Sequence, residues 1–369
     1  MAKIGETGCG CKKKNLTDVR NPGFPILDTI ELTAEITPKP DPLNPQQTQG
    51  IDSRLTVEKI VRIKAFQNHF LPRLADCANN DESKYWFKRY WQDYNCSSRL
   101  TVIDGHYHSK RCKHKECLRC QRITTYKRIT TYLPIIKTWD DPVFLTLTIP
   151  SVWGKDLRDT HRLIARHFRM VLDRLRKQGI RAVGTRNMET TFNPDRYTNR
   201  LPPYHPHLHC IVNGKAVAQL ILKYWLELYP DARGTAQDVR VFGSRATDLL
   251  EAFKYSNKVI NGKTTLERGI YLNALHTINK AYQGGKGGVR SFQPFGFKRS
   301  DVEVVPDEVK QIETILMGGD VGLLPDGNFT FVFDREAGFF DYVGDDGDCL
   351  TDYVMGESLR EFLKTKIRD

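Results

Sequence analysis

One stretch of the chain, residues 143–260, alternates short strand-like and longer helix-like patterns, and this order limits the folds open to it. Residues 143–149 (VFLTLTI) alternate large apolar side chains with threonine between two prolines, which is typical of a strand. Residues 156–177 place apolar side chains three and four apart, as a helix that buries one face does. The same patterns predict strands at 180–192, 205–212 and 239–242 and helices at 216–228 and 247–260.

This order predicts an α+β fold of the split βαβ type, because strand, helix, strand, strand, helix and strand follow one another. We expect an antiparallel sheet like that of ferredoxin and RRM domains, with helices packed on one face. Helical flanks and a cysteine-rich, zinc-binding insertion are expected outside that core.

Two histidines in the strand predicted at 205–212, which we call the histidine strand, are candidate metal ligands. His207 and His209 are two residues apart and so project from the same face of a strand. Glu189 on the preceding strand is the expected third ligand, and His205 is the alternative. Two imidazoles and a carboxylate leave coordination positions open for water or a phosphate oxygen, which suits Mg²⁺ or Mn²⁺ as a catalytic ion.

The helix predicted at 247–260, which we call the tyrosine helix, carries a candidate nucleophile. Glu251 and Tyr255 are four residues apart and Lys258 follows three later, so all three share one helix face. A tyrosine hydroxyl, with a pKa of about 10, is a poor nucleophile in isolation. Beside a metal-bound phosphodiester, and with Lys258 holding a phosphate oxygen or favouring the phenolate, Tyr255 can attack phosphorus. Glu251 is the candidate general base.

Three motifs therefore follow one another: residues 144–148 (FLTLT), the histidine strand and the tyrosine helix. Together they resemble the motifs of the HUH endonucleases. More narrowly they are similar to the rolling-circle replication initiators of small plasmids that have one catalytic tyrosine and a nearby glutamate. The resemblance covers residues 96–262, less than half of the chain.

The resemblance implies a metal-dependent nickase that acts on single-stranded and hairpin origin DNA. Tyr255 would attack the scissile phosphate, stay joined to the 5′ end and leave a free 3′-OH for a DNA polymerase. Glu251 would let water, rather than a second tyrosine, end the cycle. The metal pair of the family falls on His207 and His209, with Glu189 as third ligand. No helicase-type ATP-binding motif occurs, so a host helicase is an expected partner.

A cysteine-rich segment precedes the first motif, and its Cys-x4-Cys-x2-Cys spacing begins at Cys112. In a reducing compartment, Cys-x2-Cys binds zinc more often than it forms a disulfide. The expected ligands of a structural Zn²⁺ are Cys96, Cys112, Cys117 and Cys120. His106 or His108 is the alternative for one of the four. Such a site would present neighbouring basic side chains to DNA phosphates, and initiators of this type often carry a similar segment.

Charge is distributed very unevenly along the chain. Of 56 Lys+Arg and 44 Asp+Glu residues, only 6 basic but 17 acidic residues fall in 301–369. The remaining 50 basic and 27 acidic residues give positions 1–300 a net charge of +23. An excess of this size indicates a polyanionic partner such as nucleic acid. The acidic region is interpreted as a solubilising or partner-binding segment.

We expect a cytoplasmic protein without a membrane partner. No apolar run approaches the length of about 18 residues that a membrane span needs, and the N-terminus lacks an apolar signal segment. The nine cysteines are odd in number and unevenly placed, which argues against an extracellular disulfide framework.

Composition and motifs divide the chain into six parts. They are a flexible N-terminal segment (1–50), a helical region (51–95), the cysteine-rich zinc- and DNA-binding segment (96–125), an HUH endonuclease core (140–265), a basic glycine-rich region (266–300) and the acidic C-terminal region (301–369).

Two other functions fit parts of the pattern. An HUH single-tyrosine transposase or relaxase would use the same chemistry, but the glutamate four residues before Tyr255 favours an initiator. A non-catalytic, zinc-containing DNA-binding regulator requires that His207, His209 and Tyr255 occur together by coincidence.

Overall fold

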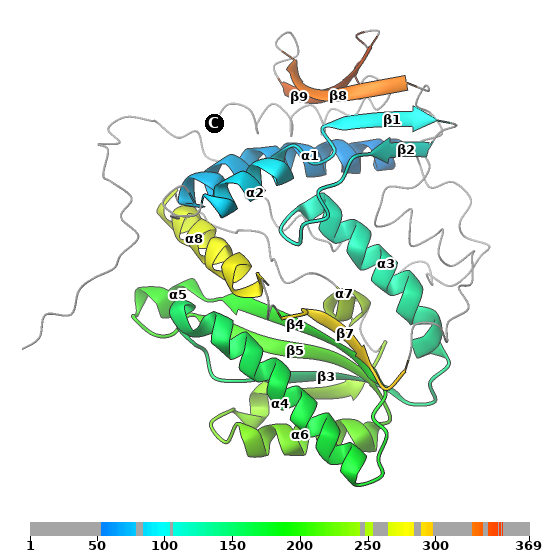
Figure 1. Cartoon of the computed structure of the whole chain (residues 1–369), viewed down its shortest axis with the longest axis vertical. Helices are drawn as coiled ribbons and strands as arrows, with labels where there is room; N and C mark the ends of the chain where they lie inside the picture. Colours follow the sequence, from blue (N-terminus) through cyan, green and yellow to red (C-terminus); the bar gives the residue numbers. More distant parts are fainter. Residues whose placement is uncertain are drawn as a thin grey trace, which may run out of the picture.

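The structure is a computed structural model that describes residues 53–78, 84–103, 106–243, 248–253, 265–283, 289–297, 327–334, 339–345, 347 and 349. Two antiparallel sheets organise these residues (Figure 1). The larger sheet lies at the bottom of Figure 1 with α4 and α6, and the smaller one lies at the top beside α1 and α2. The fold is therefore mixed α+β.

The described residues form the following helices and strands, given in chain order. The helices are α1 (Ser53–Ala78), α2 (Tyr85–Tyr94), α3 (Leu118–Lys137), α4 (Leu157–Lys177), α5 (Pro194–Thr198), α6 (Lys215–Leu228), α7 (Asp248–Phe253) and α8 (Thr265–Tyr282). The strands are β1 (Arg99–Ile103), β2 (His106–Ser109), β3 (Pro142–Thr148), β4 (Gly184–Phe192), β5 (Tyr204–Asn213), β6 (Asp238–Val241), β7 (Phe292–Phe295), β8 (Gly327–Asp334) and β9 (Phe339–Gly344). Within the described ranges, none of the helices combines the length and the apolar character that crossing a membrane requires.

The larger sheet has the strand order β6-β3-β5-β4-β7, and all its pairs are antiparallel. On the two sides of β5, Thr146 of β3 lies opposite His209, and Glu189 of β4 lies opposite His207. The edge strand β7 comes from a region in which the sequence patterns predict no strand. The register of the three central strands brings the predicted metal ligands side by side.

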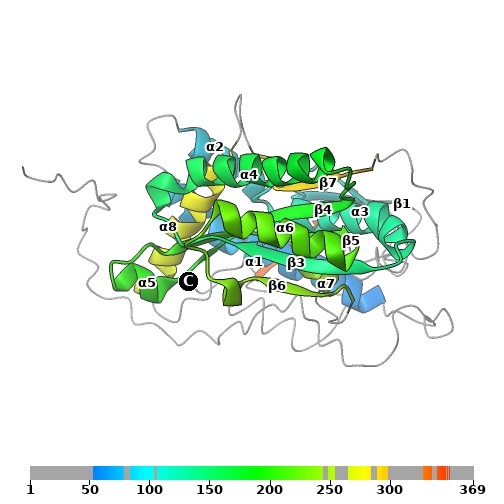
Figure 2. The ribbon, with the colours of Figure 1, turned by 90° about the horizontal axis from the view of Figure 1, so that it is seen from below.

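Helices cover both faces of this sheet, so the expectation of helices on one face only is wrong. One face packs Leu145 and Leu147 against α4 and α6, which lie side by side in Figure 2. The other face packs Phe144 and Ile211 against α3 and α7. The physical reason is that β3 carries apolar side chains at successive positions, so that both faces of the central strands need cover.

The smaller sheet has the order β2-β1-β8-β9 and joins the cysteine-rich segment to the acidic region. Its strands are antiparallel, and Leu100 of β1 pairs with Phe329 of β8. The hydroxyl of Tyr342 on β9 donates to the carbonyl of Ser97 at 2.5 Å. Asp341 is fully buried, so this part of the acidic region belongs to a folded sheet and is not a solvated tail.

His161 of α4 is buried against β4 and gives the fold a dependence on pH. Its Nε2 lies 2.7 Å from Oγ1 of Thr190, and desolvation lowers its pKa from 6.5 to about 3. The unfolded chain therefore takes up a proton below pH 6.5 that the folded chain excludes, so stability is full above that pH and falls as the pH drops towards 3.

We expect His161→Gln to reduce the acid-side slope of the unfolding free energy by up to about 1.4 kcal/mol per pH unit. Urea denaturation at several pH values across this window measures the slope, and glutamine keeps a group that can bond to Thr190. A slope identical to that of the wild type would contradict a buried, neutral His161.

Candidate functional site

Glu189, His207 and His209 come together on the face of the larger sheet that also carries α7. Their ligand atoms all lie within 4.8 Å of one another. Oε2 of Glu189 is 3.3 Å from Nε2 of His209 and 3.8 Å from Nε2 of His207. Glu189 is only 1% exposed, and a carboxylate at that depth is stable beside a cation. The group therefore fits a divalent ion with two imidazole ligands and one carboxylate ligand.

Hydrogen bonds orient both imidazoles towards Glu189. Nδ1 of His207 donates to the carbonyl oxygen of His205 at 3.0 Å, and Nδ1 of His209 lies 3.2 Å from Oγ1 of Thr146. A proton on Nδ1 leaves the Nε2 lone pair of each ring free for a metal. Sequence reasoning gave Thr146 no role. Its position in the FLTLT motif, which precedes the histidine strand, was the signal that could have pointed to it.

His205, the alternative third ligand, is not one of the three residues brought together. Its ring centroid is 5.6 Å from that of His207, and its Nδ1 lies 3.5 Å from Oγ of Ser151. Desolvation is the largest cause that lowers the pKa of His205 to about 4. Glu189 is therefore the better candidate on geometry.

Thr146→Val is expected to weaken Mn²⁺ binding by about 10- to 100-fold, because the valine methyl cannot hold Nδ1 of His209. Isothermal titration of the full chain with Mn²⁺ measures the change. Thr131→Val is the matched control, since among the described residues its hydroxyl donates to the carbonyl of Lys127 on its own helix. Equal Mn²⁺ affinities for Thr146→Val and the wild type would show that this hydrogen bond does not orient a ligand.

The short helix α7 packs on the same sheet face as the histidines. Ala252 and Phe253 share a buried cluster with Phe144 and Ile211. Phe144 is two residues from Thr146 on β3, so both point to one side of the sheet, and its ring centroid is 5.4 Å from that of His209. The start of the tyrosine helix is thus placed beside the candidate metal ligands.

A buried ion pair ties α7 to the edge strand β6. Nη2 of Arg240 lies 2.7 Å from Oδ1 of Asp248, and the amide of Gly243 donates to Oδ2 at 3.0 Å. The guanidinium of Arg240 lies 4.1 Å from the centroid of the Phe144 ring. Sequence reasoning did not identify this pair, because the two residues are eight positions apart and no helix or strand period links them.

Of the three residues predicted on the tyrosine helix, one lies in the described part of the chain. Glu251 belongs to α7, whereas Tyr255 and Lys258 lie outside the described residues, two and five positions after Phe253. Of the helix predicted at 247–260, residues 248–253 are helical as predicted. The roles of Glu251, Tyr255 and Lys258 remain predictions.

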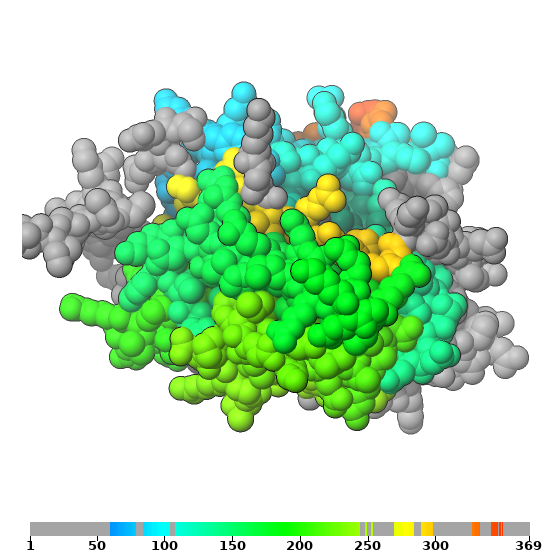
Figure 3. All heavy atoms as spheres, turned by 60° about the horizontal axis from the view of Figure 1, so that its bottom comes forward, coloured from blue at the N-terminus to red at the C-terminus, as the bar shows by residue number. Residues whose placement is uncertain are grey.

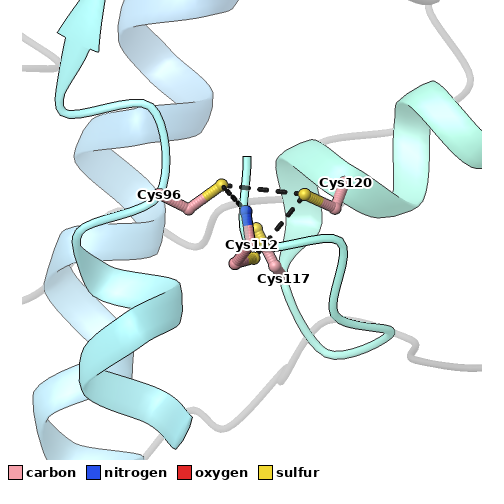
Figure 4. A group of neighbouring side chains, drawn as sticks. All are labelled: Cys96, Cys112, Cys117 and Cys120. Atoms are coloured by element: carbon pink, nitrogen blue, oxygen red, sulfur yellow. Dashed lines mark hydrogen bonds between the residues drawn. The ribbon is translucent and has the colours of Figure 1, made fainter. Parts of the chain in front are cut away.

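The four cysteines predicted as zinc ligands come together, as Figure 4 shows. They come from the turn after α2, from the loop after β2 and from the start of α3. All four Sγ atoms lie within 4.8 Å of one another, and Sγ of Cys120 is 3.6 Å from those of Cys96 and Cys112. Tetrahedral zinc with bonds of about 2.3 Å separates its sulfurs by about 3.8 Å. The cluster therefore fits Zn²⁺.

Two backbone amides donate hydrogen bonds to sulfurs of the cluster. The backbone amide of Lys113 donates to Sγ of Cys120 at 3.2 Å, and that of Cys112 to Sγ of Cys96 at 3.4 Å. The buried amine of Lys64 donates to the carbonyl of Cys96 at 2.8 Å. Hydrogen bonds among the four thiols lower the pKa of Cys96 and raise that of Cys112, so Cys96 is the thiol that most readily gives up its proton.

The histidines near the cluster lie outside the group of four sulfurs. His108, an alternative ligand, is exposed on β2, and the side chain of His106 is not among those described. Nδ1 of His114 lies 2.5 Å from Oδ1 of Asp93, and these two residues approach Cys112 in a second grouping of metal-ligand types. The set of four cysteines is the more compact zinc-ligand set.

The chain is similar to "Protein rep" of Staphylococcus aureus, with 24% identity over 168 residues. The alignment covers 41% of this chain and 71% of that relative. No family model matches the chain, and no solved structure matches it. The likeness is distant and assigns no role to an individual residue of this chain.

Proposed function

We propose that this protein is a rolling-circle replication initiator that nicks single-stranded origin DNA through a tyrosine nucleophile. One observation carries the proposal: the group of Glu189, His207 and His209 lies on the sheet face against which α7 packs, and Tyr255 follows α7 in the sequence. The likeness to Protein rep supports a replication role. The charge of positions 1–300 supports a nucleic-acid substrate.

The strand order supports the split βαβ class for the larger sheet, and with it the HUH assignment. The strands β3 and β4 are joined through α4 but are separated in the sheet by β5. β6 follows α6 and pairs with the free side of β3. This is the arrangement that the term split denotes.

In this proposal Glu189, His207 and His209 would hold Mg²⁺ or Mn²⁺. The bound ion would polarise the scissile phosphate and draw charge from it as the attacking bond forms. The protein's own contribution is to fix the ligand geometry, through the bond from His207 to the carbonyl of His205 and that between His209 and Thr146. The buried pair of Arg240 and Asp248 would keep the tyrosine helix beside that geometry.

Tyr255 would carry the chemistry. Its phenolic oxygen attacks phosphorus, and the bond from phosphorus to the 3′ oxygen breaks. The DNA on the 3′ side of the nick stays joined to the tyrosine through its 5′ phosphate. The phenolic proton passes to Glu251, and the 3′ oxygen leaves as a hydroxyl after taking up a proton from solvent. Lys258 would neutralise charge on a phosphate oxygen or on the phenolate. The free 3′-OH then serves a DNA polymerase, and a host helicase separates the strands.

At termination Glu251 would act a second time. Glu251, having released the proton of the first step to solvent, takes a proton from a water molecule as that water attacks phosphorus. The bond from phosphorus to the tyrosine oxygen breaks, and this oxygen takes up a proton from solvent to regenerate the phenol. The four-cysteine cluster is assigned a structural Zn²⁺ that holds the cysteine-rich segment against DNA.

The test is a covalent-capture assay with the full chain, Mn²⁺ and a single-stranded oligonucleotide that spans the origin of its own replicon. The strand is labelled at one end or at the other in parallel reactions. A denaturing gel should show label on the protein only when the label lies on the 3′ side of the nick, and EDTA should abolish the adduct. No cleavage of either origin strand would reject the proposal and leave a non-catalytic DNA-binding role.

A further inference from the structure

A cavity of about 380 Å³ lies on the opposite side of the larger sheet from the candidate metal ligands, between α4 and the segment that leads into β7. Its polar lining consists of five arginines and a glutamine: Arg162, Arg166, Arg169, Arg186, Arg290 and Gln293. No carboxylate is among the described residues that line it. In Figure 3 the gold atoms of residues 289–297 border the green atoms of the α4 side of the molecule. We call this site the arginine cavity.

Three different elements build the arginine cavity. Arg162, Arg166 and Arg169 are four and three residues apart on α4, so they form one stripe on that helix. Arg186 comes from β4, opposite Cys210, and Cys210 belongs to the core beneath α4. Arg290 precedes the edge strand β7. Because side chains alternate along β4, Arg186 and Glu189 point to opposite faces.

Arg186 is the observation that indicates a ligand. It is only 5% exposed, and its Nη2 donates to Oε1 of Gln293 at 2.8 Å. Its Nη1 is buried and has no hydrogen-bond partner among the described residues. Burying a guanidinium nitrogen without a hydrogen-bond acceptor costs free energy, because the hydrogen bonds that it made to water are not replaced. An anion in the cavity would supply the missing acceptor.

The charges around Arg186 favour the same kind of ligand. Desolvation is the largest cause that lowers the pKa of Arg186; Cys210 acts in the opposite direction, and the charge of Arg169 adds a smaller lowering. Arg162 has a carboxylate neighbour, Asp159 at 3.1 Å, on the exposed side of the helix. The other four arginines of the cavity have no ion pair among the described residues closer than 4.0 Å. A bound anion would relieve this repulsion.

We infer that the arginine cavity binds phosphate groups of a DNA backbone at a distance from the phosphate that is cut. The stripe from Arg162 to Arg169 spans about 10 Å of helix, which is the axial length of about three nucleotides of one strand. A stripe of this length can contact several successive phosphates of one strand. A single free phosphate would contact only part of the stripe. Planar guanidinium groups also match phosphate oxygens in pairs.

The inference rests on the proposed function for the identity of the DNA, and it adds a second contact surface. The cavity and the metal ligands lie on opposite faces of one sheet, and β7 is an edge strand of that sheet. DNA that reaches both sites therefore passes around the β7 edge, beside Arg290. The cavity would anchor the DNA that flanks the nick while the other face performs the chemistry.

The test compares two double variants of the full chain in EDTA, so that cleavage plays no part. Arg166→Ala/Arg169→Ala removes two exposed arginines of the cavity. Arg158→Ala/Lys177→Ala removes two exposed cations from the same helix outside the cavity. Fluorescence anisotropy with a labelled single-stranded oligonucleotide, and with a duplex, gives Kd as a function of salt.

We expect the cavity variant to lower the slope of log Kd against log salt by about one to two units, at about 0.7 to 0.9 per lost phosphate contact. The control variant should change that slope by less than half as much. Equal changes in the two variants would overturn the inference, since general charge alone would then explain them.

A second arm separates DNA from free phosphate. Inorganic phosphate, compared with chloride at the same ionic strength, should raise the Tm of the wild type and the control variant more than that of the cavity variant. If phosphate acts in this way while the DNA slopes of both variants are equal, the cavity binds free phosphate and the assignment to DNA is wrong. If the wild type fails to form a covalent adduct but the slopes differ as expected, the proposed nicking function is rejected and the inference that the arginine cavity binds DNA phosphates is retained.

Discussion

Tyr255→Phe is expected to abolish the covalent protein–DNA adduct and nicking, while the affinity for the uncut strand stays within about twofold of the wild type. The variant removes one oxygen atom, the one that would form the bond to phosphorus. Phenylalanine keeps the shape of the ring, so the path of the chain after α7 has no reason to change. A complete loss with preserved binding is the signature of a nucleophile, because a positioning residue leaves residual activity.

Two controls make the Tyr255 result decisive. Tyr197→Phe removes a hydroxyl from an exposed tyrosine on α5, and it should form the adduct at the wild-type rate. Mass spectrometry of the wild-type adduct after proteolysis should place the nucleotide on the peptide that contains Tyr255. An adduct in Tyr255→Phe, or a nucleotide on another peptide, would refute the role given to this residue.

Cys120→Ser is expected to lose bound zinc and to destabilise the cysteine-rich segment, because structural zinc contributes about 10 kcal/mol or more of binding free energy. The damage should extend beyond the cluster. Cys96 adjoins Ser97 and Ser98, whose carbonyls accept hydrogen bonds from Tyr342 of β9 and from the amide of Phe331 of β8. We therefore expect faster hydrogen exchange in β8 and β9 as well as around the cysteines.

Zinc content by mass spectrometry and hydrogen exchange by peptide mapping measure these two effects. Cys77→Ser is the matched control, since Cys77 lies on α1 outside the cluster, and it should retain the metal. Chelation of the wild type should reproduce the exchange pattern of Cys120→Ser. Zinc retained at the wild-type level in Cys120→Ser would show that the Cys120 thiol is not a ligand of the ion.

The central strands were predictable because their patterns are local. Prolines on either side of residues 143–149 and the alternation of Thr146 and Thr148 with apolar neighbours indicate β3 without knowledge of its partners. β8 had a comparable signal in Phe329 and Phe331, two apart. Its acidic surroundings led to its interpretation as part of a solubilising or partner-binding segment. Its partner β1 is remote in sequence, and local periodicity carries no information about such pairing.

The candidate site was predictable only to the level of residue types. Strand periodicity put His207 and His209 on one face, but the choice between Glu189 and His205 depended on register, which the loop with α5 sets. Thr146 and the pair of Arg240 and Asp248 were missed, because each acts across elements whose pairing the sequence does not state. The arginine cavity was missed for the same reason.

The pairing of β1 with β8 also constrains the order in which the chain can fold on the ribosome. β1 and β2 emerge early, whereas β8 begins only at Gly327. Until then the side of β1 that will bind β8 is an open strand edge, which is a template for pairing with other chains. Contacts between remote segments also form slowly. Premature termination before Gly327 should therefore yield a product that aggregates, even though every candidate catalytic residue has already been translated.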